Sequence, residues 1–289
     1  MKNNKYGIFM NFWVNTWEAD HAYYIKKAKE LGFDVLEFQA QALLNMTDAR
    51  MAELKSIAKE YDVELTYSLG LDKKYDIASL DENIQKAGIE YLGEIIDRIH
   101  KMDGKILSGV SYAGWGVPEV VNVEKARENS IKNMKMLGKR AQEYGITYGI
   151  EAVNRFEGII VNTAKQALDY VNRVDCDNVG ILLDTYHMNI EEDNMGDAIR
   201  TAGSKLVGLH VGENNRTAPG NGYGHIDWKE IFQALRDVDF KGRIVAEPFV
   251  MTGGEVGDAI YVWRDLVDDT SEASIDRQAK NMLNFFKSL

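Results

Sequence analysis

The stretch EKARENSIKNMKMLGKRAQEYGITYGIE, residues 124–151, contains one complete helix-to-strand unit. Its periodic apolar residues predict a long helix over 124–144. The sequence Tyr144-Gly145-Ile146 predicts the end of this helix, because glycine readily adopts the left-handed conformation that turns the chain back. A strand over 146–151 follows, and the acidic residue Glu151 closes it.

Units of this kind recur along the chain. Leu31-Gly32-Phe33 is a second helix-to-strand junction, and Thr47 is expected to cap a helix over 47–61. The predicted strands are 7–12, 34–38, 63–67, 105–109, 146–151, 179–184, 205–210 and 243–247. The predicted helices include 20–31, 47–61, 82–102, 124–144 and 273–287.

Eight strands that alternate with helices predict a parallel sheet with right-handed crossovers. With 289 residues, eight such units favour an α/β fold in which a single (β/α)8 TIM barrel forms one catalytic domain over 1–289. The first strand is not followed by G-x-G-x-x-G, which disfavours a dinucleotide-binding sheet. Three prolines and no low-complexity stretch give no sign of a linker.

The composition excludes several classes of function. A formal net charge of −11 makes nucleic acid a poor partner. The N-terminal segment MKNNKYGIF lacks the apolar core of a signal peptide, and no apolar run is long enough to span a bilayer. The lone cysteine, Cys176, cannot form an intrachain disulfide and is interpreted as structural. We therefore expect a cytoplasmic protein without a membrane partner.

The residues that end the last four predicted strands indicate a metal site. Glu151, Asp184, His210 and Glu247 each follow an apolar run, and strand ends meet at one mouth of such a barrel. Any one of them alone is more simply an ordinary polar residue meeting solvent. Three carboxylates and one imidazole together favour Mn²⁺, Co²⁺ or Mg²⁺ over a structural zinc. Without a cation, the carboxylates would raise one another's pKa.

Further polar candidates follow the same strands. Glu157, His187 and Arg216 offer the donors and acceptors that a polyol substrate needs. Trp17 and Trp115 are candidates for the wall on which the apolar face of a sugar stacks, although both could be core residues.

Other residues are given structural interpretations or left open. Arg155 is expected to form an ion pair at the barrel rim, and His21 and His100 are expected to be structural. Trp13 is a weaker candidate for the sugar wall than Trp17. His225, in the glycine-rich loop PGNGYGHIDW, fits either a lid or a solvent-facing role.

Several segments resemble the D-psicose/D-tagatose 3-epimerases, a branch of the xylose isomerase-like barrels. They are YGIFMNFW (6–13), TWEAD (16–20), EAVNRFE (151–157), LLDTYHMNIEED (182–193), AIRTAG (198–203), HVGENNR (210–216), VAEPFV (245–250) and VWRD (262–265). The resemblance implies metal ligation by Glu151, Asp184, His210 and Glu247, with Glu151 and Glu247 also acting as the acid/base pair. It further implies that Glu157, His187 and Arg216 contact the first three substrate oxygens.

The resemblance also implies Mn²⁺ or Co²⁺ as cofactor and a homo-oligomer, either dimer or tetramer. The segments SLGLDKK (68–74) and SGVSYAGWG (108–116) depart from the family pattern where the distal sugar carbons would lie. They leave the preferred ketose open between the D-fructose/D-psicose and D-tagatose/D-sorbose pairs.

The expected reaction is inversion of a ketose at C3 through a cis-enediolate, with one glutamate removing the proton and the other returning it. An aldose–ketose isomerase on the same barrel is the alternative, because its proton transfer between C1 and C2 uses the same enediol chemistry. A metal-dependent endonuclease is disfavoured by the acidic charge. A non-catalytic sugar-binding barrel gives little reason for two glutamates to flank one site.

Overall fold

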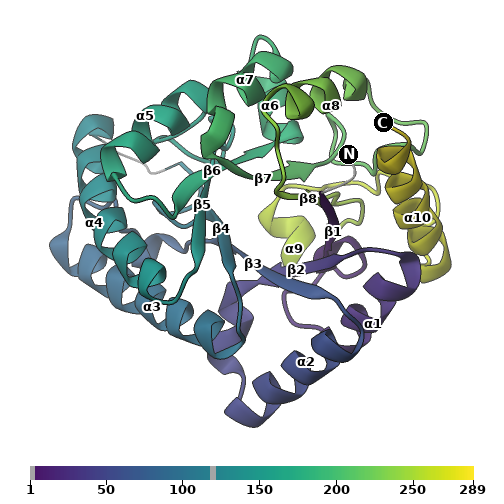
Figure 1. The fold of residues 1–289 in the computed structure, drawn as a ribbon, viewed down its shortest axis with the longest axis horizontal. Coiled ribbons are helices and arrows are strands. Elements are labelled where there is room, and N and C mark those ends of the chain that lie inside the picture. The colour runs from purple at the N-terminus through teal and green to yellow at the C-terminus, as the bar shows by residue number, and fades with distance from the viewer. Residues whose placement is uncertain (1–3, 118–121) are drawn as a thin grey trace.

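In the computed structural model, which describes residues 4–117 and 122–289, eight parallel strands close into a barrel in the order β1 to β8 (Figure 1). Closure comes from the pairing of β1 with β8, in which Gly7 lies opposite Val245. The strands are β1 Lys5–Phe9, β2 Val35–Gln39, β3 Glu64–Gly70, β4 Ile106–Val110, β5 Thr147–Glu151, β6 Val179–Asp184, β7 Leu206–Val211 and β8 Arg243–Ala246. The predicted (β/α)8 barrel is confirmed.

The helices surround the strands (Figure 1). The α-helices are α1 His21–Leu31, α2 Asp48–Glu60, α3 Glu82–Lys101, α4 Val123–Glu143, α5 Ala164–Val174, α6 Thr185–Glu191, α7 Met195–Ala202, α8 Trp228–Asp237, α9 Gly254–Ala259 and α10 Glu272–Ser288. Short 3-10 helices are η1 Met10–Phe12, η2 Ala40–Asn45, η3 Lys73–Tyr75 and η4 Gly203–Lys205. In the part of the chain that the structure describes, no helix combines the length and apolarity needed to cross a bilayer.

Local sequence signals place most of the predicted helix ends correctly. The Thr47 side chain accepts a hydrogen bond from the Arg50 backbone N–H and caps α2, as expected. Gly32 and Gly145 have φ of 96° and 65°, so the left-handed turns predicted at these two junctions are confirmed. Each predicted helix named above agrees with its observed bounds to within one residue.

Two predicted strands need correction. The first strand ends at Phe9, and residues 10–12 form η1, where the Trp13 N–H bonds to the Met10 carbonyl. The Asn11 side-chain amide donates to the Thr16 carbonyl at 2.7 Å, which keeps the chain in a loop at the barrel mouth. The third strand continues to Gly70, because its last residues pair with β4.

Candidate metal centre and active site

Four ligand-type residues meet at the carboxyl end of the barrel. Glu151 and Asp184 are the last residues of β5 and β6, and His210 is the penultimate residue of β7. Glu247 directly follows β8, and its backbone N–H bonds to the Val211 carbonyl at 3.0 Å. One ligand atom from each of the four lies within 4.8 Å of the others. The strand ends thus bring together the set that the sequence singles out.

Burial makes this carboxylate cluster electrostatically unfavourable without a cation. Burial raises the pKa of Glu151 well above its usual value; His210 opposes this rise, and Glu247 and Asp184 add to it. The pKa of Asp184 is also raised, again first by burial. One oxygen of Asp184 accepts the Tyr186 N–H at 2.7 Å and caps α6. The two raised values show that the cluster resists holding its negative charges in the absence of a positive partner.

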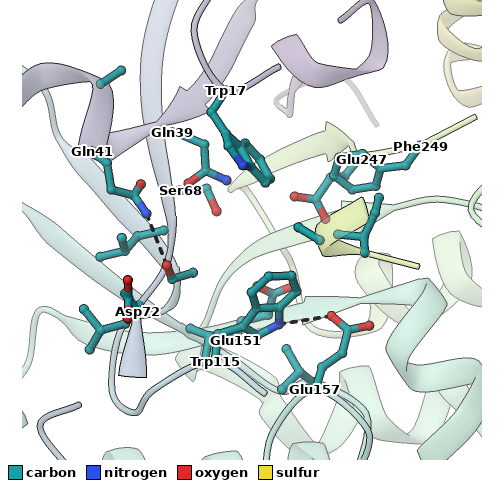
Figure 2. Close-up of a pocket in the computed structure, with 18 of the residues that line it drawn as sticks. Trp17, Gln39, Gln41, Ser68, Asp72, Trp115, Glu151, Glu157, Glu247 and Phe249 are labelled. Carbon is teal, nitrogen blue, oxygen red and sulfur yellow. Dashed lines mark hydrogen bonds between the residues drawn. The ribbon is translucent and has the colours of Figure 1, made fainter. Parts of the chain in front are cut away.

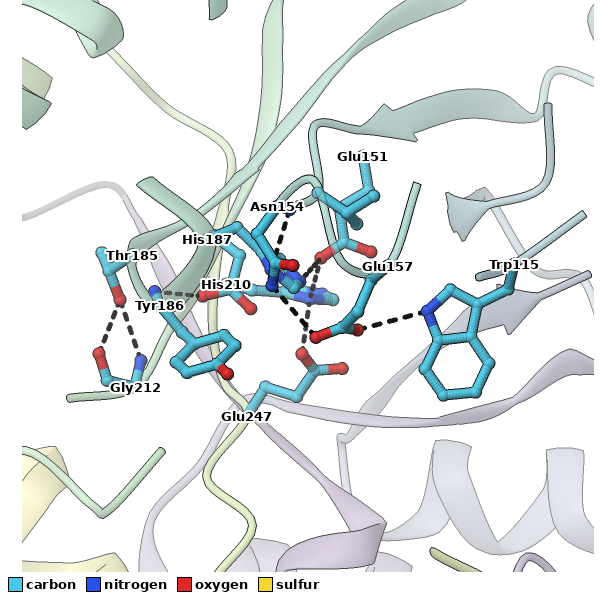
Figure 3. A network of polar contacts seen from close by, with 12 residues as sticks. Trp115, Glu151, Asn154, Glu157, Thr185, Tyr186, His187, His210, Gly212 and Glu247 are labelled. Atoms are coloured by element: carbon cyan, nitrogen blue, oxygen red, sulfur yellow. Dashed lines mark hydrogen bonds and ion pairs between the residues drawn. The ribbon is translucent and has the colours of Figure 1, made fainter. Parts of the chain in front are cut away.

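The orientation of His210 fits a metal ion at this cluster (Figure 3). Its Nδ1 is buried and has no hydrogen-bond partner among the described residues. The nearest acidic oxygens are Oε2 of Glu247 at 3.3 Å and Oε1 of Glu151 at 3.8 Å. An unpartnered imidazole nitrogen facing three carboxylates is the donor set that Mn²⁺, Co²⁺ and related divalent cations accept.

His187, on α6, is held beside the cluster in one tautomer. The backbone N–H of Asn154 donates to Nδ1 of His187 at 3.2 Å, and Nδ2 of Asn154 lies 2.8 Å from the same nitrogen. Because Nδ1 accepts, the neutral ring carries its proton on Nε2, which lies 3.8 Å from Oε1 of Glu151. Burial lowers the pKa of His187, although Glu157 and Asp184 oppose the shift. His187 therefore presents an N–H donor toward the cavity.

Glu157 receives three side-chain donors. Arg216 Nη2 donates to Oε1 at 2.9 Å. Asn154 Nδ2 donates to the same oxygen at 3.1 Å, and Trp115 Nε1 donates to Oε2 at 3.2 Å (Figure 3). Burial alone would raise the pKa of Glu157, but Arg216 and His187 outweigh it and the net pKa is lowered. Glu157 is therefore a buried, ionised acceptor.

A cavity of about 560 Å³ opens above the cluster (Figure 2). Its lining includes five of the predicted site residues on the metal side, namely Glu151, Glu157, His187, Arg216 and Glu247. Trp17 and Trp115 line it as well, so both tryptophans lie where a sugar wall was expected. Phe249 completes an aromatic side, and its ring packs edge-on against Phe9 with centroids 5.9 Å apart.

The far end of the cavity is polar. Gln39, Gln41, Ser68 and Asp72 line it, from β2, β3 and the adjacent segments (Figure 2). Gln41 donates to the Gly70 carbonyl at 3.1 Å, whereas Oε1 of Gln39 has no hydrogen-bond partner among the described residues. The segment at the end of β3 and after it, SLGLDKK (68–74), thus contributes to the cavity. This is one of the two segments that depart from the family pattern.

Several residues lie away from the cavity lining. Arg155 forms a bidentate ion pair with Glu191 at 2.9 Å, as expected of a rim residue. The Trp13 indole N–H donates to Asp276 on α10 at 2.8 Å, so this tryptophan belongs to the packing between the barrel and its last helix. Cys176 is buried, and burial raises the pKa of its thiol, in keeping with a structural role.

Three further histidines, His21, His100 and His225, are not among the residues that line the cavity. His21 packs edge-on against Phe38, and burial lowers its pKa to about 4, so it is a neutral core residue. His100 stacks on Tyr144 between α3 and the end of α4. His225 is exposed. The two structural interpretations therefore agree with the observed contacts.

The structure adds residues that the sequence analysis missed. Glu37, in β2, lies 2.8 Å from Nε2 of His210 through its Oε1, and its Oε2 accepts a hydrogen bond from Thr66 at 2.8 Å. A charged residue in the middle of the apolar strand VLEFQ is the signal that points to Glu37. Thr66 carries no such signal, since threonine is common in strands.

Comparison with known proteins gives the family. Residues 25–276 match the family model of the xylose isomerase-like TIM barrels. The D-psicose 3-epimerase of Enterocloster bolteae is 42% identical over 285 residues, which cover 97% of this chain and 94% of the relative. The D-psicose 3-epimerase of Ruminiclostridium cellulolyticum is 40% identical and covers 97% and 96% of the two chains. The chain belongs to the D-psicose 3-epimerase family.

Solved structures support the same assignment. A D-psicose 3-epimerase from Clostridium cellulolyticum, determined with D-tagatose, superposes with a TM-score of 0.96 at 40% identity and covers 98% of each chain. Another D-psicose 3-epimerase, determined in the presence of D-fructose, gives a TM-score of 0.96 at 36% identity, again over 98% of each chain. This chain is therefore an enzyme of the isomerase class, a carbohydrate epimerase.

Proposed function

We propose that this epimerase inverts C3 of a free ketose, interconverting D-fructose and D-psicose or D-tagatose and D-sorbose. The observation that carries the proposal is the pair Glu151 and Glu247. These carboxylates come from different strands and approach the same nitrogen of His210, at 3.8 and 3.3 Å, at the floor of one cavity. We propose that a ketose in this cavity has one of the two carboxylates on each side of its C3.

The two glutamates are the proposed acid and base. One carboxylate removes the C3 proton, which is acidic because it lies next to the C2 carbonyl, and a cis-enediolate remains. The other glutamate, in its protonated form, donates a proton to the opposite face of C3 and leaves the epimer.

Glu151, Asp184, His210 and Glu247 would hold one divalent cation, which we propose to be Mn²⁺ or Co²⁺, with Mg²⁺ as a third candidate. When bound, the cation supplies Lewis-acid polarisation of the C2 carbonyl. Glu157, His187 and Arg216 are proposed to bind the first three substrate oxygens, since they offer one buried acceptor and two buried donors. Trp17 and Trp115 are proposed as the walls against the apolar sugar face.

We further propose that residues 1–289 act as one catalytic domain within a homo-oligomer, either dimer or tetramer. The aromatic pair Tyr261 and Trp263 supports self-association, because these side chains are 64% and 70% exposed. Light scattering of the purified protein tests this part, and a monomer at micromolar concentration would contradict it.

The test of the reaction is incubation of the metal-stripped protein with D-fructose in heavy water, with and without Mn²⁺, followed by NMR. We expect D-psicose with deuterium at C3 only when Mn²⁺ is added. An aldose product would instead support an aldose–ketose isomerase. Turnover of D-tagatose but not of D-fructose would support the same mechanism with a different preferred substrate.

A further inference from the structure

Glu37 lies inside the barrel, one layer below the four ligand-type residues. On β2 it shares a face with Gln39, which lines the cavity, because alternate residues of a strand point the same way. The pairing of β2 with β3 sets Glu37 opposite Thr66 and Gln39 opposite Ser68. Glu37 is only 2% exposed, so its environment is the barrel interior and not the solvent-filled mouth.

Both oxygens of Glu37 have assigned neighbours. Oε1 lies 2.8 Å from Nε2 of His210, and Oε2 accepts a hydrogen bond of 2.8 Å from the Thr66 hydroxyl. Within residues 4–117 and 122–289, His210 is the one basic side chain found within ion-pair distance of Glu37. A carboxylate this deeply buried is costly unless it is paired, so the contact with His210 accounts for its presence in the strand.

The contact determines which nitrogen of His210 faces the carboxylate cluster. Nε2 is the His210 nitrogen that lies within ion-pair distance of Glu37, so we place the ring proton on Nε2 and the lone pair on Nδ1. Nδ1 is the nitrogen that lies 3.3 Å from Glu247 and has no hydrogen-bond partner among the described residues. A histidine that binds a metal through one nitrogen usually donates its other N–H to a carboxylate or carbonyl.

We propose that Glu37 is a positioning residue of the metal centre. It holds the His210 ring with the Nδ1 lone pair directed at the site, and Thr66 orients the Glu37 carboxylate in turn. The inference rests on the proposed function, because it assumes that Glu151, Asp184, His210 and Glu247 bind a divalent cation.

The experiment compares Mn²⁺ binding by the full-length wild type and Glu37→Gln, using calorimetric titration of the metal-stripped proteins. Glutamine keeps the size of the side chain, which matters because a second cavity of about 20 Å³ borders Glu37, Thr66 and His210 and a smaller residue would enlarge it. We expect Mn²⁺ affinity to fall about 10- to 100-fold, the usual effect of losing the partner of a ligating histidine. Glu37→Asp, which keeps a carboxylate, should recover part of the loss.

Glu64→Gln is the matched control. Glu64 is also a glutamate of a barrel strand, the first residue of β3, and it is paired with Lys5 and Arg243. In the described part of the chain it forms no ion pair with His210. The variant Glu64→Gln should change the thermal stability of the protein but not its affinity for Mn²⁺. A structural role for Glu37 predicts the same behaviour in Glu37→Gln, so unchanged Mn²⁺ affinity in folded Glu37→Gln would overturn the inference.

Two further readouts make the test decisive. If Glu37→Gln does not fold, Thr66→Val replaces it. Loss of the hydroxyl that orients Glu37 should weaken Mn²⁺ binding by less than the glutamine change, and wild-type affinity would overturn the inference. The visible absorption spectrum of the Co²⁺ form should also change in Glu37→Gln, because it depends on ligand geometry. If the wild type does not bind Mn²⁺, that result would instead contradict the proposed function itself.

Discussion

Nη2 of Arg216 lies 2.9 Å from Oε1 of Glu157 and joins two loops that are 59 residues apart in the sequence. Both residues are only 7% exposed. The guanidinium also stacks on the Tyr186 ring at 4.1 Å, and the Arg216 backbone has a φ of 62°. That conformation costs a non-glycine residue on the order of 1–3 kcal/mol, so the surrounding turn must hold Arg216 in place.

Arg216→Gln should therefore reduce stability strongly. Removing the cation leaves Glu157 buried without its ion-pair partner, which typically costs about 3–5 kcal/mol of unfolding free energy. Asn154 and Trp115 still donate to Glu157, so we expect the lower part of this range. Chemical denaturation of the metal-stripped protein measures the loss.

The double variant Glu157→Gln/Arg216→Gln provides the control. Removing both charges leaves no buried charge unpaired, so the double variant should be more stable than Arg216→Gln alone. If the unfolding free energy lost in the double variant equals the sum of the losses in Glu157→Gln and Arg216→Gln, the two residues are not coupled.

Glu247→Gln should keep the fold and lose nearly all epimerase activity. The change removes a proposed acid/base group at the cavity, and each such group typically contributes ~10²–10⁴-fold to the rate. Activity has to be measured at saturating Mn²⁺, because Glu247 is also a proposed ligand. Glu60→Gln, on the exposed end of α2, is the control and should be fully active. Turnover near that of the wild type in Glu247→Gln would refute its catalytic role.

The barrel could be predicted because its signals are local. Glycine after a helix and alternating apolar runs act within a few residues, so Gly32 and Gly145 marked real junctions. The end of the first strand could not be predicted in this way. The run GIFMNF has one polar residue, Asn11, but the chain already leaves the strand at Met10 and forms η1, where the Asn11 side chain donates to the Thr16 carbonyl. Such loop contacts leave no periodic trace in the sequence.

The same distinction applies to the site. Parallel strands bring their carboxyl ends to one mouth, so Glu151, Asp184, His210 and Glu247 could be grouped from strand ends alone. Glu37 lies in mid-strand, and its contact with His210 crosses the barrel interior from β2 to β7. Which side chains meet there depends on the strand register around the closed barrel, and a single sequence does not reveal it.

Asn154→Asp should raise the pKa of His187. In the wild type, burial lowers this pKa, so the ring is neutral at and above pH 6.5. A carboxylate 2.8 Å from Nδ1 would favour the protonated ring, and protonation would persist to higher pH. NMR titration of the histidine ring signals in the Mg²⁺ form measures the shift. Asn281→Asp adds the same charge on the exposed face of α10 and should leave His187 unchanged.

Gln39→Leu should raise KM for a ketohexose more than it lowers kcat. Gln39 lines the polar part of the cavity, and its amide oxygen has no hydrogen-bond partner among the described residues. A contact with a distal hydroxyl would stabilise ground state and transition state alike, and its loss should raise KM about tenfold. A ketopentose, which is one carbon shorter, should be affected less. Equal effects on both sugars would argue against a distal contact.

Mn²⁺ affinity should fall as the pH falls from 8 to 6. In the metal-free protein, burial raises the pKa of Glu151 and of Asp184. Burial lowers the pKa of His210, but Glu247 and Glu37 outweigh it and raise this pKa well above the ordinary value. Groups with raised pKa values hold more protons at lower pH, and a cation must displace those protons to bind.

The raised pKa values of Glu151, Asp184 and His210 therefore predict that Mn²⁺ affinity rises with pH. Calorimetric titrations at pH 6, 7 and 8, each in two buffers with different ionisation enthalpies, measure both the affinity and the number of protons released. We expect proton release on binding, larger at pH 6 than at pH 8. Affinity that is constant over this range, with no proton release, would mean that Glu151, Asp184 and His210 are already deprotonated without a metal, contrary to the direction of their pKa shifts.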